Sequence, residues 1–438
     1  MRRMKRSLIC VIMVLLLSLG AGCGKQNTAS EDFQRANCRN TYVNSIMKTE
    51  SGYYYGKKNS ELELHYYDSK NGKNMYLCNK PECRHDGNEF CAATSDKYTV
   101  MEMALYGDDI YINAIEQTEK TYQFKLLRAS GDGSSLSEVV TYFETDAKDR
   151  LPGYIFDEVT EMVIHRGRAF LAYSLVNVHN KDIGVCGTAI YDLQTGELTY
   201  LWEKDMDLTE VDENFCGCGD YMFFIRAKGS RKHLYRYSYK EGSLEKMELE
   251  RGFRGQYAFY DENTCFYIKD NGDLYLYKHD TGENINVDCE KWSGMWQKVQ
   301  VAGRSERINV NTPVIDSVLS DGEYVYTAEF MSFDNFFYPY MERTCEIGGE
   351  TVDVTVDYVE VIVLNSEGEL VNEVKVSPKE VLGKIDDFTL HFTNNTVYLQ
   401  TSVMVYECPK EDFVAGKVNF TEAYPVDIER ENREEKVQ

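Results

Sequence analysis

Three cysteines and one histidine gather in the segment YLCNKPECRHDGNEFCAA, residues 76–93. They are Cys78, Cys83, His85 and Cys91. Three thiolates and one imidazole form the Cys3His set that a structural zinc site accepts, although the spacing differs from the common pair of cysteines two residues apart. Asp86 could orient the imidazole ring from outside the ligand set. These residue types predict a site for zinc or a similar soft metal.

The same thiols allow two other interpretations. In the first, two of the three cysteines form a disulfide and the third pairs with Cys38 or stays free, which an exported protein permits. In the second, all three stay free, and Cys83 with His85 could act as a nucleophile and its base. Residues two apart on an extended segment point the same way, but no third, orienting group is evident. Metal analysis and counting of free thiols distinguish these interpretations.

A repeated unit of short strands must position this segment. Seven times along the chain, an aromatic and β-branched strand precedes two alternating strands around a Gly-containing turn, as in TAIYDLQTGELTYLW at 188–202. Such turns connect β-hairpins. A period of about 55 residues with several short strands per unit is typical of a β-propeller with loop insertions. We predict an all-β chain folded as a β-propeller of seven blades, with six or eight blades, or a pair of two-sheet sandwiches, as alternatives.

The cysteine segment follows the last strand of the first unit and precedes the second unit. It is therefore expected at a connection between blades. That position favours a structural cross-link, made by zinc or by a disulfide, over a place in a catalytic site.

The repeated units and the stretch LCNKPECRH at 77–85 resemble the extracytoplasmic, TolB-like β-propeller lipoproteins of Gram-positive, Clostridia-like bacteria. The resemblance covers most of the chain beyond residue 22. It implies the fold and the cellular address, and it brings no established activity.

The first 22 residues are typical of a secretory signal. Four basic residues precede an apolar run from Leu8 to Leu19, which is too short to span a bilayer. Small residues then lead to Cys23, as in a bacterial lipobox, although Gly20 stands where an aliphatic residue is usual. We expect lipidation of Cys23 and anchoring at the outer face of the cytoplasmic membrane. The alternative is an ordinary signal peptide with an incidental cysteine.

The rest of the chain divides simply. Residues 23–41 are polar and suit a flexible tether. We assign residues 42–430 to the propeller domain and residues 431–438 to a charged tail.

The charge balance restricts the partners. The chain has 72 acidic and 48 basic side chains and a net charge of -24. Nucleic acid is disfavoured, because phosphate recognition needs clusters of Lys and Arg. Cations, basic peptides and uncharged glycans fit better, and a solvated acidic surface also accounts for the charge. We expect a monomer.

Aromatic side chains mark a candidate binding loop in the longest insertion, residues 331–358. Exposed aromatic residues suit protein interfaces or stacking on sugars, whereas the plainer interpretation is a loop folded back over a blade edge. The candidates are Phe333, Phe336, Phe337, Tyr338 and Tyr340, together with Trp292 and Trp296.

The sequence contains no G-x-S-x-G, H-E-x-x-H or P-loop motif. We predict a non-enzymatic binding or interaction module at the cell surface, which takes a protein or a glycan through propeller loops. The alternative is a propeller-type carbohydrate-active enzyme, a lyase or a hydrolase.

Overall fold

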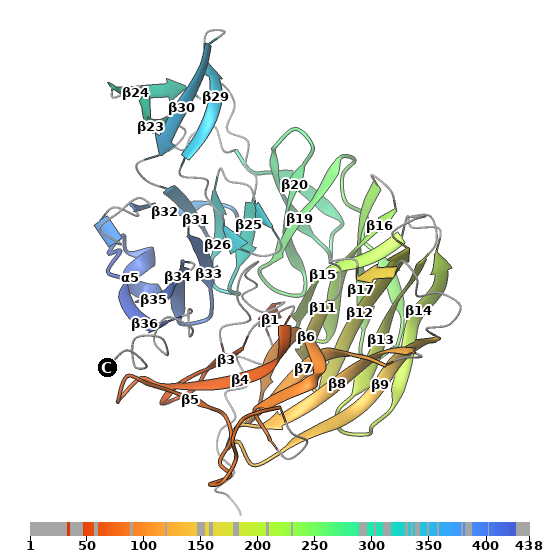
Figure 1. Ribbon diagram of the computed structural model, residues 1–438. Helices are drawn as coiled ribbons and strands as arrows, with labels where there is room; N and C mark the ends of the chain where they lie inside the picture. The colour runs from red at the N-terminus through yellow and green to blue at the C-terminus, as the bar shows by residue number, and fades with distance from the viewer. Residues whose placement is uncertain are drawn as a thin grey trace, which may run out of the picture.

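The computed structural model describes residues 33–35, 47–56, 60–87, 91–118, 121–146, 154–156, 161–177, 184–206, 210–228, 231–288, 296–301, 304–309, 317–328, 332–333, 336–337, 342–347, 350–356, 359–377, 380–381, 388–401 and 403–425. All structural statements below concern these residues. They form antiparallel sheets arranged one after another (Figure 1).

The first sheet has eight strands in the order β2-β3-β4-β6-β7-β8-β9, with β5 paired to β4. The strands are β2 (Met47–Lys48), β3 (Gly52–Gly56), β4 (Ser60–Asp68), β5 (Lys73–Tyr76), β6 (Thr94–Tyr106), β7 (Asp109–Gln117), β8 (Thr121–Ser130) and β9 (Leu136–Asp146). Strand β6 pairs with β4 through its first half and with β7 through its second. Side chains from both halves of the sheet, such as Leu64 and Ile112, share one core. Two four-stranded repeats are therefore joined by β6.

Five further sheets are separate blades in the described part of the chain. The first comprises β10 (Tyr154–Phe156), β11 (Glu161–His165), β12 (Arg168–Asn177), β13 (Gly184–Asp192) and β14 (Leu198–Met206). The second comprises β15 (Glu210–Cys218), β16 (Tyr221–Lys228), β17 (Arg231–Ser238) and β18 (Leu244–Lys246). The third comprises β19 (Phe253–Phe259), β20 (Thr264–Lys269), β21 (Leu274–Lys278) and β22 (Glu283–Asn286).

The last two blades carry the insertions. The fourth comprises β25 (Ser317–Ser320), β26 (Val325–Ala328), β31 (Val359–Leu364) and β32 (Leu370–Val376). The fifth comprises β27 (Ser332–Phe333), β28 (Phe336–Phe337), β33 (Thr389–Phe392), β34 (Thr396–Gln400), β35 (Met404–Pro409) and β36 (Thr421–Pro425). A short helix, α5 (Lys410–Val414), connects β35 to β36.

Apolar cores lie between successive sheets and close the ring. Five clusters of buried side chains each combine residues from neighbouring sheets. A further cluster joins Tyr53 and Tyr55 of β3 to Tyr398 and Tyr424 of the last blade. The first and last sheets thus pack against each other, which leaves few open sheet faces. The protein is an all-β β-propeller, as the repeat predicts.

One backbone hydrogen bond recurs from unit to unit. In each case the residue directly after one strand of an antiparallel pair donates its N–H to the carbonyl of the residue that directly precedes the other strand of that pair, at 2.8 to 3.1 Å. The pairs are Ser69 to Ser51, Gly131 to Asp108, Leu193 to Gly167, Tyr239 to Asp220, His279 to Asn263 and Lys410 to Asn395. The same junction between two paired strands therefore recurs in six units.

The number of separate blades differs from the seven that the period predicts. Five blades are separate in the described residues. The difference arises because β4 and β6 pair directly, through Glu63 and Thr94 among others, and so merge the first two repeats into one sheet. Hydrophobic alternation is the same whether two units are joined by strand pairing or only share a core. The sequence therefore could not indicate that β4 and β6 pair.

Three residues of the predicted tether form a strand. Strand β1 (Phe33–Arg35) pairs antiparallel with β15, with Phe33 opposite Cys218, and also lies against β11. A backbone that pairs with a sheet edge is fixed there, so the tether prediction does not describe these three residues. Cys23, the remainder of the predicted tether and the predicted tail at 431–438 lie outside the described residues.

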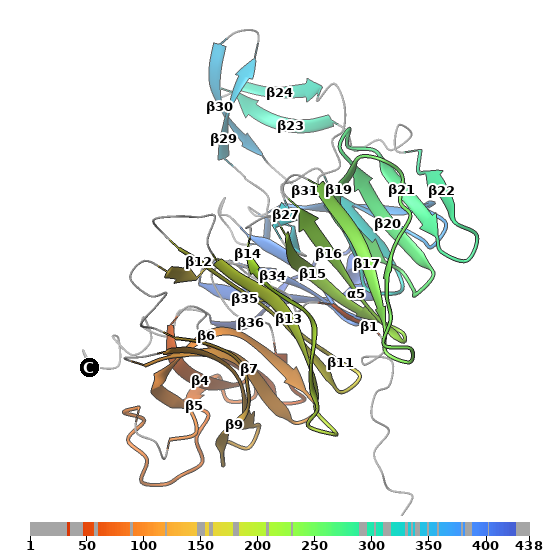
Figure 2. The ribbon, with the colours of Figure 1, turned by 90° about the vertical axis from the view of Figure 1, so that its right-hand side faces the viewer.

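A small sheet stands apart from the blades in both ribbon views (Figure 2). Its strands, in the order β24-β23-β30-β29, are β23 (Trp296–Val301), β24 (Arg304–Asn309), β29 (Glu342–Ile347) and β30 (Glu350–Val356). Strands β29 and β30 belong to the long insertion between β26 and β31. The insertion therefore builds structure of its own outside the ring.

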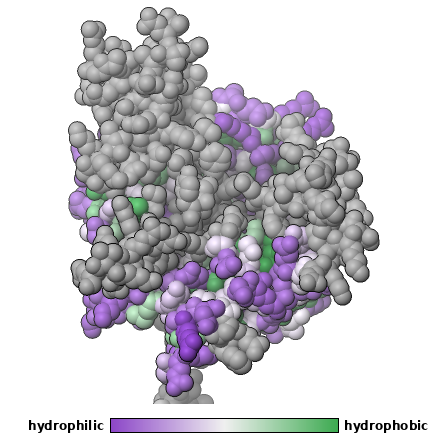
Figure 3. Space-filling view, in the orientation of Figure 1, coloured by the Kyte–Doolittle hydropathy of each residue, from purple (hydrophilic) through white to green (hydrophobic). Residues whose placement is uncertain are grey.

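The described residues visible on one face are mostly hydrophilic (Figure 3). This agrees with the excess of acidic side chains. Among the described residues, no helix has the length and hydrophobicity needed to cross a bilayer.

Candidate metal centre

A single residue of β4 fixes both ends of the cysteine loop. Leu77, directly after β5, donates its N–H to the carbonyl of Leu64 at 2.9 Å, and Leu64 donates its own N–H to the carbonyl of Ala93 at 2.7 Å. Strand β6 begins at the next residue, Thr94. The loop of residues 77–93 thus leaves the first sheet and returns to it beside the same residue, Leu64. Residues 88–90 of this loop lie outside the described residues.

Local turns direct the side chains inward. Cys83 donates its N–H to the carbonyl of Lys80 at 3.1 Å, which closes a turn. His85 has φ of 53° and Gly87 has φ of 82°, conformations that reverse the chain direction. Positive φ costs a non-glycine residue about 1 kcal/mol or more, and such strain is found at functional sites. The N–H of Gly87 is held by the hydroxyl of Thr94 at 3.1 Å.

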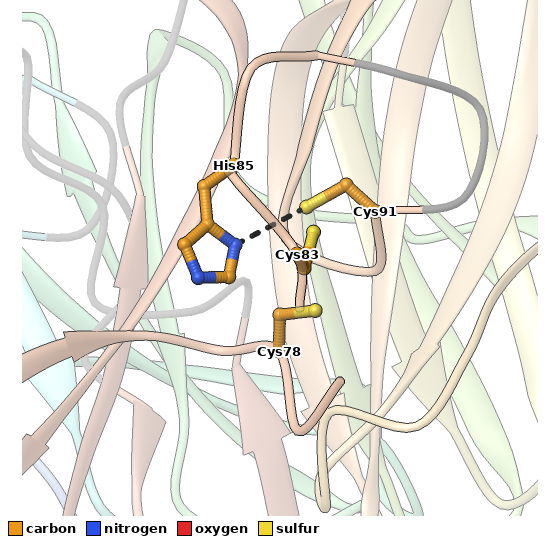
Figure 4. Close-up of side chains that lie close together, drawn as sticks. All are labelled: Cys78, Cys83, His85 and Cys91. Carbon is orange, nitrogen blue, oxygen red and sulfur yellow. Dashed lines mark hydrogen bonds between the residues drawn. The ribbon is translucent and has the colours of Figure 1, made fainter. Parts of the chain in front are cut away.

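The four predicted ligands converge (Figure 4). One donor atom each from Cys78, Cys83, His85 and Cys91 lies within 4.8 Å of the others. His85 Nδ1 is 3.5 Å from Cys91 Sγ. Among the described residues this is the one group of three or more His, Cys, Asp or Glu side chains with such convergence.

The donor set fits zinc. Two sulfur atoms bound to tetrahedral zinc at about 2.3 Å lie about 3.8 Å apart, so a contraction of about 1 Å or less brings the set to coordination distance. Cys91 is buried in the core shared by the two halves of the first sheet, and Cys78 and Cys83 pack against that core. Four protein donors leave no open position, which is the pattern of a structural site.

Backbone N–H groups surround the sulfur atoms. Burial acts to raise the pKa of Cys78, but hydrogen bonds from the N–H groups of Ala92 and Lys80, together with those from Cys83 and Cys91, outweigh it and hold that pKa below the ordinary value of a thiol. Ala93 donates its N–H to Cys91 Sγ at 3.4 Å. Donors aimed at sulfur stabilise thiolates, which are the form that binds metal.

The neighbouring sulfur atoms also oppose the deprotonation of one another. The N–H of His85 acts to lower the pKa of Cys83, but partial burial and the neighbouring sulfur atoms of Cys91 and Cys78 raise it overall. One thiolate therefore opposes the formation of the next. A bound cation removes this opposition, because it compensates the charge of all three sulfur atoms.

A glycine from the second repeat closes over the loop. Gly133, in the turn between β8 and β9, has φ of 70°, and its carbonyl accepts the N–H of Asn79 at 3.0 Å. A Cβ atom at this position would lie 3.0 Å from the backbone N of Cys78. The cysteine loop of the first repeat therefore touches the second repeat, as its position in the sequence predicts. The sequence did not identify Gly133 as a neighbour of the cysteine loop, because a glycine in the turn between two strands is ordinary in a hairpin.

No disulfide joins Cys78, Cys83 and Cys91, which are free thiols, as are the buried Cys265 and Cys408. Cys186, Cys216 and Cys218 are buried as well. Cys38, the partner considered for a disulfide, lies outside the described residues.

The predicted aromatic loop is divided among different sheets. Phe333 lies in β27, and Phe336 and Phe337 form β28, where Phe337 pairs with Leu390 of β33. This backbone pairing is that of a loop folded onto a blade edge. Trp296 begins β23 in the outlying sheet. Tyr338, Tyr340 and Trp292 lie outside the described residues, as does the lipidation candidate Cys23.

Two buried carboxylates on inner strands have structural partners. Glu102 of β6 accepts the N–H of Met162 at 2.5 Å. Glu161 of β11 accepts the N–H groups of Asn214 and Phe215 at 2.6 and 3.0 Å. Each carboxylate thus links one repeat to the next, a role that the sequence did not indicate.

Solved structures that resemble this chain do so at low sequence identity. No protein-family model matches the sequence, and no curated protein matches it. BamB from Moraxella catarrhalis is 11% identical, with a TM-score of 0.37 over 82% of this chain and 79% of that chain. Oligogalacturonate lyase from Vibrio parahaemolyticus is 11% identical, with a TM-score of 0.44 over 85% of this chain and 88% of that chain.

A third structure, puromycin hydrolase, is 10% identical, with a TM-score of 0.46. The match covers 90% of this chain and 55% of the hydrolase, so the chain spans about half the length of that enzyme. These likenesses include a lyase and a hydrolase, and at such scores they carry no argument about activity.

Proposed function

We propose that this protein is a lipid-anchored, extracytoplasmic β-propeller that binds a protein or glycan partner without catalysis, and that its Cys3His centre holds a structural zinc ion. The zinc assignment is carried by one observation: four soft donors lie within 4.8 Å of one another at the edge of a core. This set matches a closed, tetrahedral zinc site.

The ion would act as a staple between the first two repeats. Its ligands come from a loop fixed at both ends to Leu64, and that loop contacts Gly133 of the second repeat. Binding to the folded chain alone stabilises the fold. The ring starts with repeats that share a sheet, and zinc would hold their connecting loop in place.

We also propose a ring of seven units. The recurring turn hydrogen bond supports six of them, including both halves of the first sheet. The sheet of β25, β26, β31 and β32 adds another four-stranded unit in the same order. Counted in this way, the merged sheet contributes two units and the separate blades five.

The hydrogen bonds of two buried carboxylates favour binding over catalysis. A glycoside hydrolase typically needs two carboxylates that converge on a substrate, whereas Glu102 and Glu161 hold the backbone of neighbouring strands. The acidic surface favours a basic peptide or an uncharged glycan as the partner.

Metal content and thiol count test the zinc centre. Protein purified without reductant is expected to carry about one zinc per chain, and Cys83→Ser is expected to lose it. The matched control is Cys265→Ser, which removes a buried free thiol outside the centre. A wild-type protein with paired thiols and no zinc would refute the assignment.

A glycan array and incubation with the retained polysaccharides test the binding module. Retention without new reducing ends or unsaturated products supports it. Turnover of any polysaccharide would favour the enzyme instead.

A further inference from the structure

The imidazole of His85 lies against an aromatic ring. The ring centroids of Tyr76 and His85 are 4.6 Å apart, and their planes are inclined by 23°. Tyr76 also contacts His65, with centroids 4.6 Å apart. The tyrosine therefore has one imidazole partner in the metal centre and one in the sheet.

His65 is fixed by its own contacts. Its side chain is buried, and Nε2 lies 2.9 Å from a carboxylate oxygen of Glu63. Its ring stacks on Tyr55 at 5.3 Å, and Tyr55 stacks on Tyr424 at 5.8 Å. A row of rings thus runs from the cysteine loop into the core where the first and last sheets meet.

His85 needs such support. It lies at positive φ in a loop, between the end of β5 at Tyr76 and the start of β6 at Thr94. An imidazole in this setting has rotamers that turn Nδ1 away from Cys91. The stacked ring of Tyr76 restricts this rotation, and partners of this kind outside the ligand set orient metal-binding histidines.

We infer that Tyr76 is a positioning residue of the metal centre, which holds the His85 ring with Nδ1 toward Cys91, and that His65 with Glu63 holds Tyr76. The inference rests on the proposed zinc site. The face of the ring contacts His85, so the ring rather than the hydroxyl group carries the effect. The tyrosine therefore contributes to metal affinity although it donates nothing to the metal.

Zinc affinity and the absorption spectrum of the Co²⁺-substituted protein test this role. Tyr76→Leu is expected to bind zinc about 10 to 100-fold more weakly. Its Co²⁺ bands should shift toward those of His85→Ala, because the imidazole no longer stays bound. Tyr76→Phe keeps the ring and should retain both the affinity and the spectrum of the wild type.

Tyr200→Leu is the matched control, since Tyr200 is another partly exposed tyrosine on an outer strand. Tyr76→Thr is measured in parallel, because its β-branched side chain suits a strand and supplies a ring-free variant if Tyr76→Leu does not fold. Unchanged affinity and spectrum in the ring-free variants would overturn the inference, and so would an equal loss in Tyr76→Phe. A wild-type protein that binds neither Zn²⁺ nor Co²⁺ would overturn the zinc site as well.

Discussion

The Nδ1 atom of His85 and the Sγ atom of Cys91 lie 3.5 Å apart, although the two residues flank a loop. A nitrogen at about 2.0 Å and a sulfur at about 2.3 Å from a tetrahedral zinc ion are separated by about 3.5 Å. This pair therefore has the spacing of bound ligands. Cys91 lies in the core, and His85 is brought to it by a turn and by the ring of Tyr76.

Gly133→Ala is expected to weaken zinc binding. The new methyl group would press on the backbone of Cys78, where the space to the nitrogen is 3.0 Å, and shift the first ligand. Positive φ at this position adds strain of about 1 kcal/mol. Zinc affinity and melting temperature are the measurements.

The control for this substitution is Gly282→Ala. Gly282 has φ of 68°, close to that of Gly133, but has open space around its Cβ position. It carries the strain without the contact. Equal zinc affinity in the two variants would show that Gly133 does not support the metal loop.

The sequence predicted the four candidate ligands but not their surroundings. Cys78, Cys83, His85 and Cys91 are close in the chain, so their types and spacing sufficed to predict a metal site. Tyr76 reaches His85 only because β5 ends where the loop begins. Gly133 lies beyond three further strands, and no local pattern marks a contact at that separation.

The fold class also followed from the repeat, whereas the sharing of sheets did not. Alternating strands and Gly-containing turns specify hairpins, and the antiparallel pairing of the strands around these turns bears this out. Whether β4 pairs with β6 depends on the path of the chain between them, which alternation does not encode. Helix α5 occupies a turn whose five helical residues are too few for a periodic signal.

His391 is expected to make stability fall in acid. Burial lowers its pKa to about 3, against an unfolded value of about 6.5. The unfolded chain therefore binds the proton more readily, so this contribution is complete above about pH 6.5 and is lost as the pH falls toward 3. The expected slope is about 1.4 kcal/mol per pH unit for one proton.

Urea unfolding midpoints between pH 7.5 and 4.5 measure this effect. His391→Gln, which can still reach the hydroxyl of Thr389 that bonds Nε2 at 3.0 Å, should show a shallower decline than the wild type. Parallel declines in the two proteins would assign the acid sensitivity to other groups.

Asp212→Ala is expected to destabilise the fold strongly. Asp212 is buried and accepts two hydrogen bonds from Arg226, at 2.7 and 2.9 Å, and one from Thr188 at 2.9 Å. Its removal leaves a largely buried guanidinium without its anion, at a cost of about 3 to 5 kcal/mol. Asp220→Ala breaks an exposed pair with Arg166 and should cost about 1 kcal/mol or less. Similar melting temperatures for the two variants would contradict the distinction.

Cys23→Ala is expected to release the protein from membranes. We propose that lipid at this cysteine is the anchor, so the variant should move to the soluble fraction and lose incorporation of labelled fatty acid. Cys38→Ala, a change in the same predicted tether, is the control. Retention of Cys23→Ala in the membrane fraction, together with release of Cys38→Ala from it, would contradict the lipobox interpretation.

X-ray absorption at the zinc edge of the purified protein tests the central claim most directly. A Cys3His centre predicts about three sulfur neighbours at about 2.3 Å and one nitrogen neighbour at about 2.0 to 2.1 Å. A shell of oxygen and nitrogen atoms alone, or the absence of zinc from protein with free thiols, would contradict it.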